Sequence, residues 1–258
     1  MMNTSIPYRF RMAVQSFFHA LSIEVYPLWR ARQGGFVYEP VRAMANYAPW
    51  LMDTLFSQTY DAVKDHTYVD RYRCYELWTL VEQSDKLSGG ALIEIGVWRG
   101  GSGAIIAKKA KSIGILDPVY LCDTFRGVVK AGPEDITFYK GGEHADTSKK
   151  IVEQLVHNNL ELDNVIVLEG IFPDESAHLI SSTQFRFCHI DVDTYQSAKD
   201  SLNWVWDKMV IGGMIVFDDY GFRYCEGVTK YVEELRGLPD RLLIHNLNGH
   251  AILIKTHE

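Results

Sequence analysis

Cysteines, prolines and long apolar runs are all scarce in this sequence. Its 258 residues include only four cysteines and eight prolines. The cysteines form no C-x-x-C pair, so the sequence predicts neither a disulfide framework nor a thiolate metal site, and reduced thiols favour a cytoplasmic location. No stretch reaches the roughly 18 uninterrupted apolar residues that a membrane-spanning helix needs. We therefore expect no membrane span.

Positive charge is also in short supply. The chain carries 26 Lys and Arg against 33 Asp and Glu, which gives a formal net charge of −7. A protein that binds nucleic acid generally needs a basic surface to displace counterions from phosphates. Nucleic-acid partners are therefore not expected. With 47% hydrophobic residues, the chain is long enough for one large domain with a substantial core.

The first 65 residues are rich in aromatic side chains and are interrupted by prolines and glycines. We predict short helices here that cover a core or pack on a second subunit, which favours a homodimer or a larger homo-oligomer. Residues 9–26 are similar to a signal peptide, but polar residues break the apolar run and no small-residue cleavage site follows. An amphipathic or interface helix is predicted there instead. Residues 1–65 are thus expected to form an N-terminal helical extension, and residues 66–258 the main domain.

From residue 91 onward, strand patterns alternate with helical ones. A helix at 67–87 comes first, and the segments 91–97, 119–123, 164–170, 185–191 and 212–219 have the short apolar runs of buried strands. This alternation predicts an α/β fold with a parallel sheet and helices on both faces. Two further strand runs flank Asn248-Gly249, a turn signal that predicts an antiparallel C-terminal hairpin. Residues 126–147 are polar and glycine-rich, so we expect a long loop or lid.

The segment "IEIGVWRGGSG", residues 93–103, follows a strand and opens a helix. Its glycine spacing is not G-x-G-x-x-G, so a pyrophosphate site is a poor fit. Glu94 would suit a cationic ligand or a sugar hydroxyl, and Asp123 ends the next strand, where an acid can accept hydrogen bonds from ribose. A glycine-rich turn with a solvated Glu and a helix-capping Asp is the alternative. Together the features favour a nucleoside such as S-adenosylmethionine.

Three carboxylates follow two of the later strands: Asp191 after one, and Asp218 and Asp219 after the next. The ends of parallel strands meet at one edge of a sheet, where three carboxylates would repel one another unless protonated or bound to a cation. All-oxygen ligation favours Mg²⁺, with Mn²⁺ or Ca²⁺ as substitutes. Helix capping is the alternative for each acid. Asp193 could cap the helix that begins near Tyr195 or support the metal from behind its ligands.

At these residues the chain resembles the macrocin O-methyltransferase family of bacterial sugar O-methyltransferases. The matching pieces are "IEIGVWRGGSG", "CDTFRG", "HIDVDTYQSAKDSL" and "GGMIVFDDYG", between about residues 70 and 232. The resemblance implies a seven-stranded Rossmann-like methyltransferase domain over residues 66–258, S-adenosylmethionine as methyl donor, Mg²⁺ dependence, and a sugar or glycoside acceptor. The chain departs from the family pattern in "VVKAGPED" and "FYKGGEHADTS", so the identity of the acceptor is not indicated.

The resemblance also implies roles for individual residues. On the methionine side of the donor it places Glu94, Gly96, Arg99, Gly100 and Ser102. Near the ribose it places Asp123 and Thr124, and Phe125 could pack on the adenine or on a sugar. The expected metal ligands are Asp191, Asp218 and Asp219. Asp191 is also the expected general base, with His144 in the predicted lid as a second candidate.

Two other functions remain open at this stage. A catechol-type or other small-molecule O-methyltransferase can share the fold and the carboxylates, and would methylate catechols but not glycosides. A non-catalytic nucleoside-binding protein would bind the donor without turnover and would tolerate Asp191→Asn.

Overall fold

The computed structural model describes residues 30–41 and 43–257 of the chain, which divides into two compact units, residues 1–46 and 47–258. The helix predicted at residues 9–26 lies outside the described residues. The described part of the first unit contains an antiparallel hairpin, β1 (Ala31–Gln33) and β2 (Phe36–Tyr38). Gly34 and Gly35 turn it with positive φ angles of 55° and 86°. The short helices predicted for residues 1–65 are present at Pro49–Leu51 and Thr54–Val63. At residues 31–38 the prediction was wrong, because the two glycines turn a hairpin.

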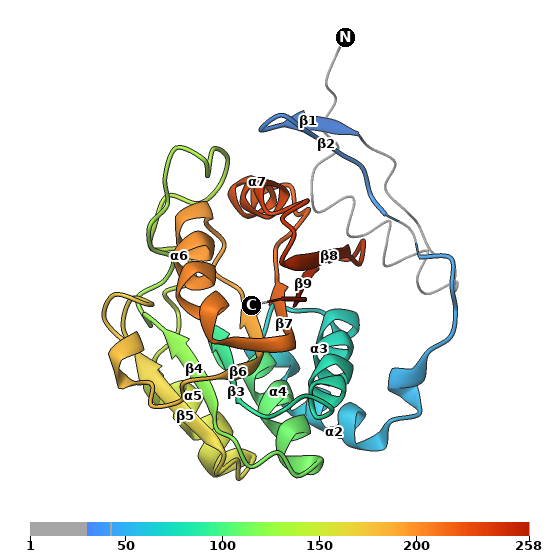
Figure 1. Cartoon of the computed structure of the whole chain (residues 1–258), viewed down its shortest axis with the longest axis vertical. Helices are drawn as coiled ribbons and strands as arrows, with labels where there is room; N and C mark the ends of the chain where they lie inside the picture. The colour runs from blue at the N-terminus through green and yellow to red at the C-terminus, as the bar shows by residue number, and fades with distance from the viewer. Residues whose placement is uncertain (1–29, 42, 258) are drawn as a thin grey trace. The chain divides into compact units, whose positions relative to one another are not determined.

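The second unit is built on a seven-stranded sheet in the order β5-β4-β3-β6-β7-β9-β8 (Figure 1). Neighbouring strands from β5 to β7 are parallel, whereas β9 runs antiparallel to both β7 and β8. The predicted mostly parallel sheet with a C-terminal hairpin is therefore confirmed. The strands are β3 (Ala91–Ile95), β4 (Val119–Asp123), β5 (Val165–Glu169), β6 (Phe185–Ile190), β7 (Met209–Phe217), β8 (Arg241–His245) and β9 (Ala251–Lys255).

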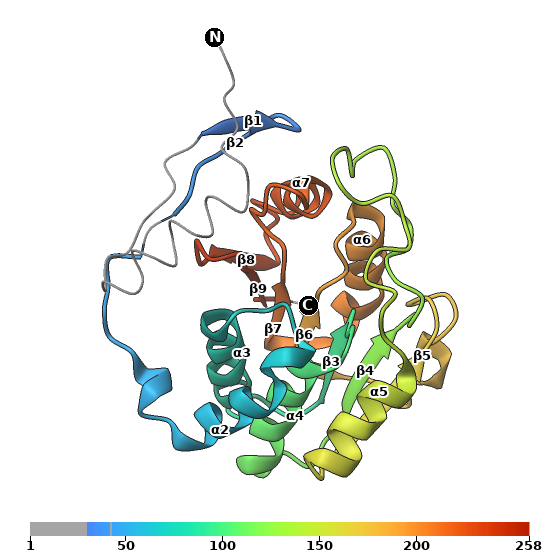
Figure 2. The same ribbon diagram turned by 180° about the vertical axis from the view of Figure 1, so that it is seen from behind.

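Helices cover both faces of this sheet (Figures 1 and 2). Their apolar sides form one core with α2 to α5 on one face and a second core with α6 and α7 on the other. The described part of the chain contains no helix that is long and apolar enough to cross a membrane. The helices are α2 (Thr54–Val63), α3 (Arg71–Ser84), α4 (Gly101–Ser112), α5 (Lys149–Glu153), which continues as a π-helical turn (Gln154–Asn159), α6 (Tyr195–Val205) and α7 (Glu226–Glu234). Short 3-10 turns are Pro49–Leu51, Lys64–His66, Ala177–Leu179 and Trp206–Lys208.

The second unit begins earlier in the chain than the sequence predicted. Asp53 caps α2 by accepting a hydrogen bond from the Phe56 amide, and its other oxygen accepts one from the indole of Trp78 in α3. Phe56 and Val63 of α2 are buried in the same core as α3 and α4. The observed division therefore falls after Asn46 and not after residue 65, because α2 is part of the core.

Residues 126–147 connect β4 to α5 without a helix or strand, as predicted for a long loop. The first half of this segment is anchored to its surroundings. Lys130 forms ion pairs with Asp174 and Asp200, at 2.7 and 2.6 Å, and Asp135 accepts a hydrogen bond from the Tyr195 amide at 2.9 Å. Asp135 thereby satisfies an amide at the start of α6. The loop is thus fixed to α6 through polar contacts.

Candidate active site

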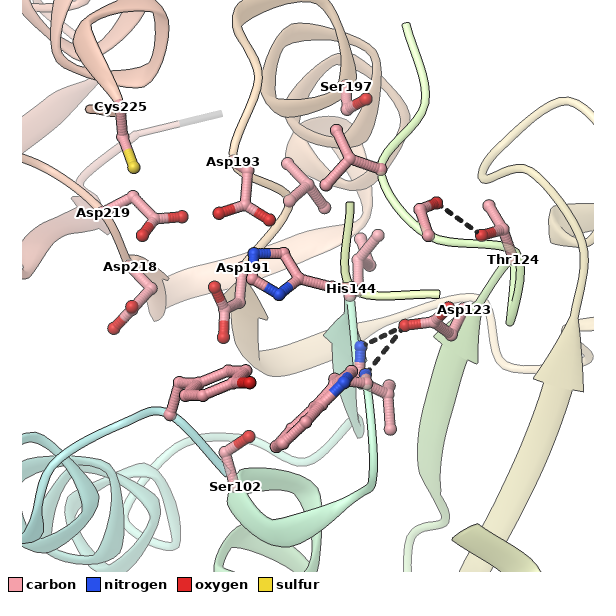
Figure 3. A pocket seen from close by; sticks show the side chains of 18 of the residues that line it. Ser102, Asp123, Thr124, His144, Asp191, Asp193, Ser197, Asp218, Asp219 and Cys225 are labelled. Atoms are coloured by element: carbon pink, nitrogen blue, oxygen red, sulfur yellow. Dashed lines mark hydrogen bonds between the residues drawn. The ribbon is translucent and has the colours of Figure 1, made fainter. Parts of the chain in front are cut away.

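A cavity of about 350 Å³ opens where β3, β4, β6 and β7 end (Figure 3). Ligands of open parallel sheets bind at this carboxyl edge. Carboxylates gather on one side of the cavity, while Asp123 and Thr124 lie on the other. The segment 126–147 also contributes to the wall, through Gly127, Val128, Val129, Tyr139 and His144. The cavity therefore joins the two groups of residues that the sequence singled out.

The turn between β3 and α4 is held tightly against the ends of two neighbouring strands. Gly96 has a φ of 84°, and a Cβ atom there would lie 1.7 Å from the carbonyl oxygen of Asp191, so no larger residue fits. Asp123 accepts hydrogen bonds from the amides of Val97 at 2.7 Å and Trp98 at 2.9 Å. These contacts fix the turn beside the cavity. Gly96, Ser102, Asp123 and Thr124, all predicted to contact the donor, line the cavity.

Glu94 does not reach the cavity, which corrects the sequence expectation of a direct contact with a ligand. It alternates along β3 with Ile93 and Ile95, so it points to the α4 face of the sheet. There it is fully buried and lies 2.8 Å from Nδ1 of His189. Burial inside the strand had suggested a ligand contact, but the partner is another strand residue.

Three more residues predicted to bind the donor lie outside the cavity lining. Arg99 forms an ion pair with Asp146 at 2.6 Å, which ties the β3–α4 turn to the loop 126–147. Gly100 is the N-cap of α4, with a φ of 90°. Phe125 is buried in the core on the α2–α5 side. These residues shape the walls and do not face the space between them.

The three predicted metal ligands come together as expected. Asp191, Asp218 and Asp219 each offer a carboxylate oxygen, and the three oxygens lie within 4.8 Å of one another. Enclosure by the protein raises the pKa of Asp191 well above its usual range, and the charges of Asp218 and Asp219 add to this. Burial and the charge of Asp193 do the same for Asp219. The cluster is thus short of positive charge around Asp191 and Asp219.

Asp218 has a different environment because Arg73 of α3 forms an ion pair with it. Burial alone would raise the pKa of Asp218, but Arg73 and the nearby His189 and His250 hold it well below its usual range. Asp70, the N-cap of α3, holds the other side of the Arg73 guanidinium at 2.9 Å. No local pattern in the sequence indicates Arg73, which is 145 positions away from Asp218 in the chain.

Asp193 lies on the cavity wall and does not cap α6, since Asp135 bonds the Tyr195 amide. Its φ of 64° is left-handed. Burial raises the pKa of Asp193 to about 7, although the nearby Tyr139 hydroxyl acts to lower it. An oxygen of Asp193, an oxygen of Asp219 and the Cys225 sulfur lie within 4.8 Å of one another. Asp193 is therefore a fourth acid of the site.

Aromatic rings frame the side of the cavity near the β3–α4 turn. Tyr68 stacks on Trp98 with ring centroids 4.2 Å apart, and His144 lies 5.4 Å from the Tyr68 ring. The His144 Nε2 is 3.4 Å from the Tyr139 hydroxyl. His144 therefore reaches the cavity from the loop 126–147, as the sequence predicted, close to the residues around Asp193.

The carboxylate cluster fits a hard divalent cation. Its donors are all oxygens, the preferred ligands of Mg²⁺. One oxygen of Asp219 is buried and finds no hydrogen-bond partner among the described residues. A buried, unpaired carboxylate oxygen beside two other carboxylates is an unfavourable arrangement that a bound cation would relieve.

A family model of macrocin O-methyltransferases (TylF) matches residues 57–249. The chain belongs to the macrocin O-methyltransferase family. The predicted resemblance is thus confirmed over three quarters of the sequence. The match begins inside α2, in agreement with the position of this helix in the core.

Three curated relatives of this family member are named as O-methyltransferases, and the name of one specifies a rhamnosyl group. The chain is 26% identical over 171 residues to demethyldecarbamoylnovobiocin O-methyltransferase of Streptomyces niveus. The alignment covers 62% of this chain and only 64% of that protein. It is 28% identical over 185 residues to a tetracenomycin rhamnosyl 4'-O-methyltransferase of Streptomyces olivaceus. This alignment covers 68% of this chain and 70% of that protein. Mycinamicin III 3''-O-methyltransferase of Micromonospora griseorubida is 26% identical, in an alignment that covers 69% of this chain and 74% of that protein.

Solved structures confirm the fold. The O-methyltransferase NovP superposes with a TM-score of 0.63 at 24% identity, covering 74% of this chain and 83% of NovP. An O-methyltransferase of Bacillus cereus in complex with SAH gives a TM-score of 0.51 at 16% identity. The superposition covers 95% of this chain and 97% of that one. This family member therefore has the Rossmann-like methyltransferase fold.

Proposed function

We propose that this protein transfers a methyl group from S-adenosylmethionine to a hydroxyl of a sugar or a glycosylated natural product, with Mg²⁺ bound by the carboxylate cluster. One observation carries the proposal: a single cavity has a glycine turn and Asp123 on one side and clustered carboxylates on the other. The name of one relative, which specifies a rhamnosyl group, supports a glycoside acceptor.

The donor is expected to occupy the side formed by the ends of β3 and β4. Gly96 lines this side, where its missing side chain lets the turn pack against the Asp191 carbonyl, and Asp123 is placed to accept hydrogen bonds from ribose hydroxyls. Ser102 lies in the first turn of α4, where helix amides favour a carboxylate such as that of the methionine moiety. Thr124 extends this wall beyond Asp123.

The carboxylate side is expected to bind the acceptor. When bound, Mg²⁺ would lower the pKa of the acceptor hydroxyl and fix its direction, while the sulfonium of the donor supplies an activated methyl group. Asp191 and Asp219 would hold the cation together with Asp218, whose orientation Arg73 fixes. The protein's contribution is mainly to place the two reactants in line.

We further propose that Asp193 accepts the acceptor's proton. Asp191 was the base expected from the sequence, but a carboxylate bound to a cation has a lower proton affinity and is a weaker base. Asp193 is outside the three-acid cluster and lines the same cavity, together with Tyr139 and His144. Its left-handed backbone fits a residue whose position is set by the site.

Methyl transfer from labelled S-adenosylmethionine to a panel of acceptors tests the proposed function. The panel contains deoxysugar glycosides with free hydroxyls, and catechols as the matched alternative. We expect labelled glycosides, and we expect EDTA to abolish transfer and Mg²⁺ to restore it. Methylation of catechols but not of glycosides would overturn the acceptor assignment, and full activity in EDTA would overturn the role of the cation.

Three variants separate the candidate bases. Asp193→Asn is expected to lower kcat by about 100-fold or more while Mg²⁺ affinity stays near the wild-type value. Asp191→Asn is expected to lose Mg²⁺ binding as well as activity. His144→Gln is the control for the second base named from the sequence. A large loss of kcat in His144→Gln with an active Asp193→Asn would assign the proton to His144.

A further inference from the structure

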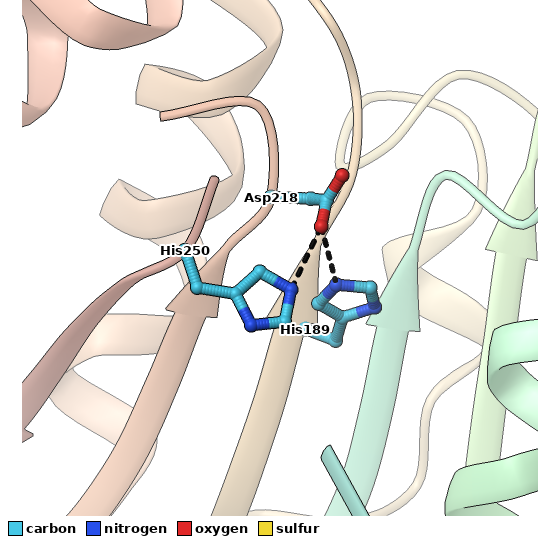
Figure 4. A group of neighbouring side chains, drawn as sticks. All are labelled: His189, Asp218 and His250. Atoms are coloured by element: carbon cyan, nitrogen blue, oxygen red, sulfur yellow. Dashed lines mark ion pairs between the residues drawn. The ribbon is translucent and has the colours of Figure 1, made fainter. Parts of the chain in front are cut away.

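A row of ionisable side chains, buried except for the partly exposed Glu76, lies behind Asp218. It runs from Glu76 of α3 through His250, in the turn before β9, to Asp218, and on through His189 of β6 to Glu94 of β3. Figure 4 shows that both imidazole rings point toward the same oxygen of Asp218. The His250 Nε2 lies 2.8 Å from this oxygen and the His189 Nε2 lies 3.9 Å from it. We call these five residues the buried ion-pair row.

Each histidine of the row is held by a glutamate through its other nitrogen. Nδ1 of His250 lies 2.5 Å from Glu76, and Nδ1 of His189 lies 2.8 Å from Glu94. Both histidines and Glu94 are wholly buried. Placing charged groups in the interior has a large desolvation cost, which only good geometry and further hydrogen bonds offset. Such a row therefore indicates that the orientation of its central member matters.

The row and Arg73 together fix both oxygens of Asp218. The Arg73 guanidinium pairs with Oδ2, and the two histidines approach Oδ1. The carboxylate thus has Arg73 against one oxygen and His250 against the other, and rotation would break its ion pair with Arg73. Asp218 is also one of the three acids of the cation site, whereas Glu76, His189, His250 and Glu94 do not line the cavity. The row therefore reaches the cation site only through Asp218.

We propose that His250, oriented by Glu76, is a positioning residue that fixes the carboxylate of Asp218 for Mg²⁺ binding. The inference rests on the proposed function, because it presupposes a cation in the cluster. It makes the C-terminal hairpin and α3 determinants of cation affinity, although both lie behind the ligands. Partners that orient metal ligands typically change metal affinity by about 10- to 100-fold when they are removed.

The test is Mg²⁺ affinity, measured without methyl transfer. The full chain is saturated with S-adenosylhomocysteine, bound Mn²⁺ is followed by electron paramagnetic resonance, and Mg²⁺ is titrated as the competitor. His250→Leu removes both contacts, and His250→Gln restores an N–H donor of similar reach. His245→Leu is the matched control, since His245 lies on β8 of the same hairpin and packs on Tyr220 instead of Asp218.

His250→Leu is expected to weaken Mg²⁺ binding by about 10-fold or more, while the Kd for S-adenosylhomocysteine changes less than about 2-fold. His250→Gln should recover most of the loss, and His245→Leu should match the wild type. Wild-type Mg²⁺ affinity in folded His250→Leu, or an equal loss in His245→Leu, would overturn the proposal and leave the proposed function standing.

A second variant covers the case in which His250→Leu does not fold. Glu76→Gln keeps the shape of the side chain but removes the charge that holds Nδ1 of His250, and it should also weaken Mg²⁺ binding several-fold. Wild-type affinity in Glu76→Gln would then overturn the positioning role. A wild-type protein that binds neither Mn²⁺ nor Mg²⁺ would overturn the cation's part in the proposed function, and this inference with it.

Discussion

Asp218 and Asp219 are neighbours in the chain, yet their surroundings are opposite. Asp218 is enclosed by Arg73, His189 and His250, which hold its pKa well below the usual range. Asp219 is enclosed by other acids, and burial and their charge raise its pKa well above the usual range. The same substitution at the two positions therefore removes different interactions: an ion pair at one and a repulsion at the other.

Asp218→Asn is expected to lower the free energy of unfolding by about 3–5 kcal/mol, because it leaves the buried Arg73 guanidinium without its main partner. Asp219→Asn in EDTA should change it by less than about 1 kcal/mol or raise it slightly, since it removes a like charge and Asn tolerates the left-handed φ of 65°. Urea unfolding monitored by circular dichroism measures both. Equal destabilisation would contradict the assigned environments.

At the level of residues, the sequence predicted what lies at strand ends and missed what reaches them from elsewhere. Asp123, Asp191 and Asp219 follow strands whose ends meet, so the pattern placed them together. Arg73 comes from a helix before the sheet, and its contact with Asp218 depends on tertiary packing that no local pattern encodes. The prediction that Glu94 contacts a ligand was wrong for a related reason. The face of the sheet to which Glu94 points was ambiguous until its pairing with His189 of β6 was known.

At the level of elements, the loop 126–147 has two differently attached parts. Its first part is anchored by Lys130 and by the contact of Asp135 with α6. Its last part is attached to the β3–α4 turn by Asp146, which pairs with Arg99 and accepts a hydrogen bond from the Trp98 indole at 2.9 Å. Asp146 thus links the two walls of the expected donor side.

Asp146→Ala is expected to loosen this link and to weaken S-adenosylhomocysteine binding by about 3- to 10-fold, because the side chains of Trp98 and Arg99 must then be ordered on binding. Isothermal titration calorimetry measures the affinity, and hydrogen exchange should show faster exchange in residues 140–147. Asp163→Ala is the control, since it breaks a similar exposed ion pair, with Lys111, away from the cavity. Unchanged affinity and exchange in Asp146→Ala would show that the link does not serve the donor.

Elements with a strong periodic pattern were predicted well and the others were not. All five parallel strands and the C-terminal hairpin lie where the apolar runs indicated, because burial on both faces leaves a clear signal. The hairpin β1–β2 was missed because its three-residue strands are too short to show alternation. α2 was assigned to an extension because its membership in the core depends on contacts with α3 and α4.

At the level of the whole molecule, the position of the domain boundary has a direct consequence. A chain that begins at residue 66 lacks α2, and with it the fully buried Phe56 and Val63. Loss of one buried Phe side chain alone costs about 3–5 kcal/mol. A chain that begins at Tyr47 keeps the whole second unit.

Residues 47–258 are therefore expected to fold and to melt within a few degrees of the full chain, whereas residues 66–258 should be unfolded or melt at least about 10 °C lower. Differential scanning calorimetry measures both, and light scattering on the full chain and on 47–258 tests the predicted homo-oligomer and the part that residues 1–46 play in it. Equal stability of the two truncated chains would show that α2 is dispensable.

Thermal unfolding tests whether a nucleoside donor site lies beside a Mg²⁺ site. It is measured with S-adenosylhomocysteine, with and without Mg²⁺, in the wild type and Asp219→Asn. A ligand at about 100 times its Kd adds roughly 2.7 kcal/mol, which should raise Tm by about 5 °C or more. We expect the nucleoside to raise Tm in both proteins, and Mg²⁺ to raise it further only in the wild type. A wild-type protein whose Tm responds to neither ligand would contradict the account.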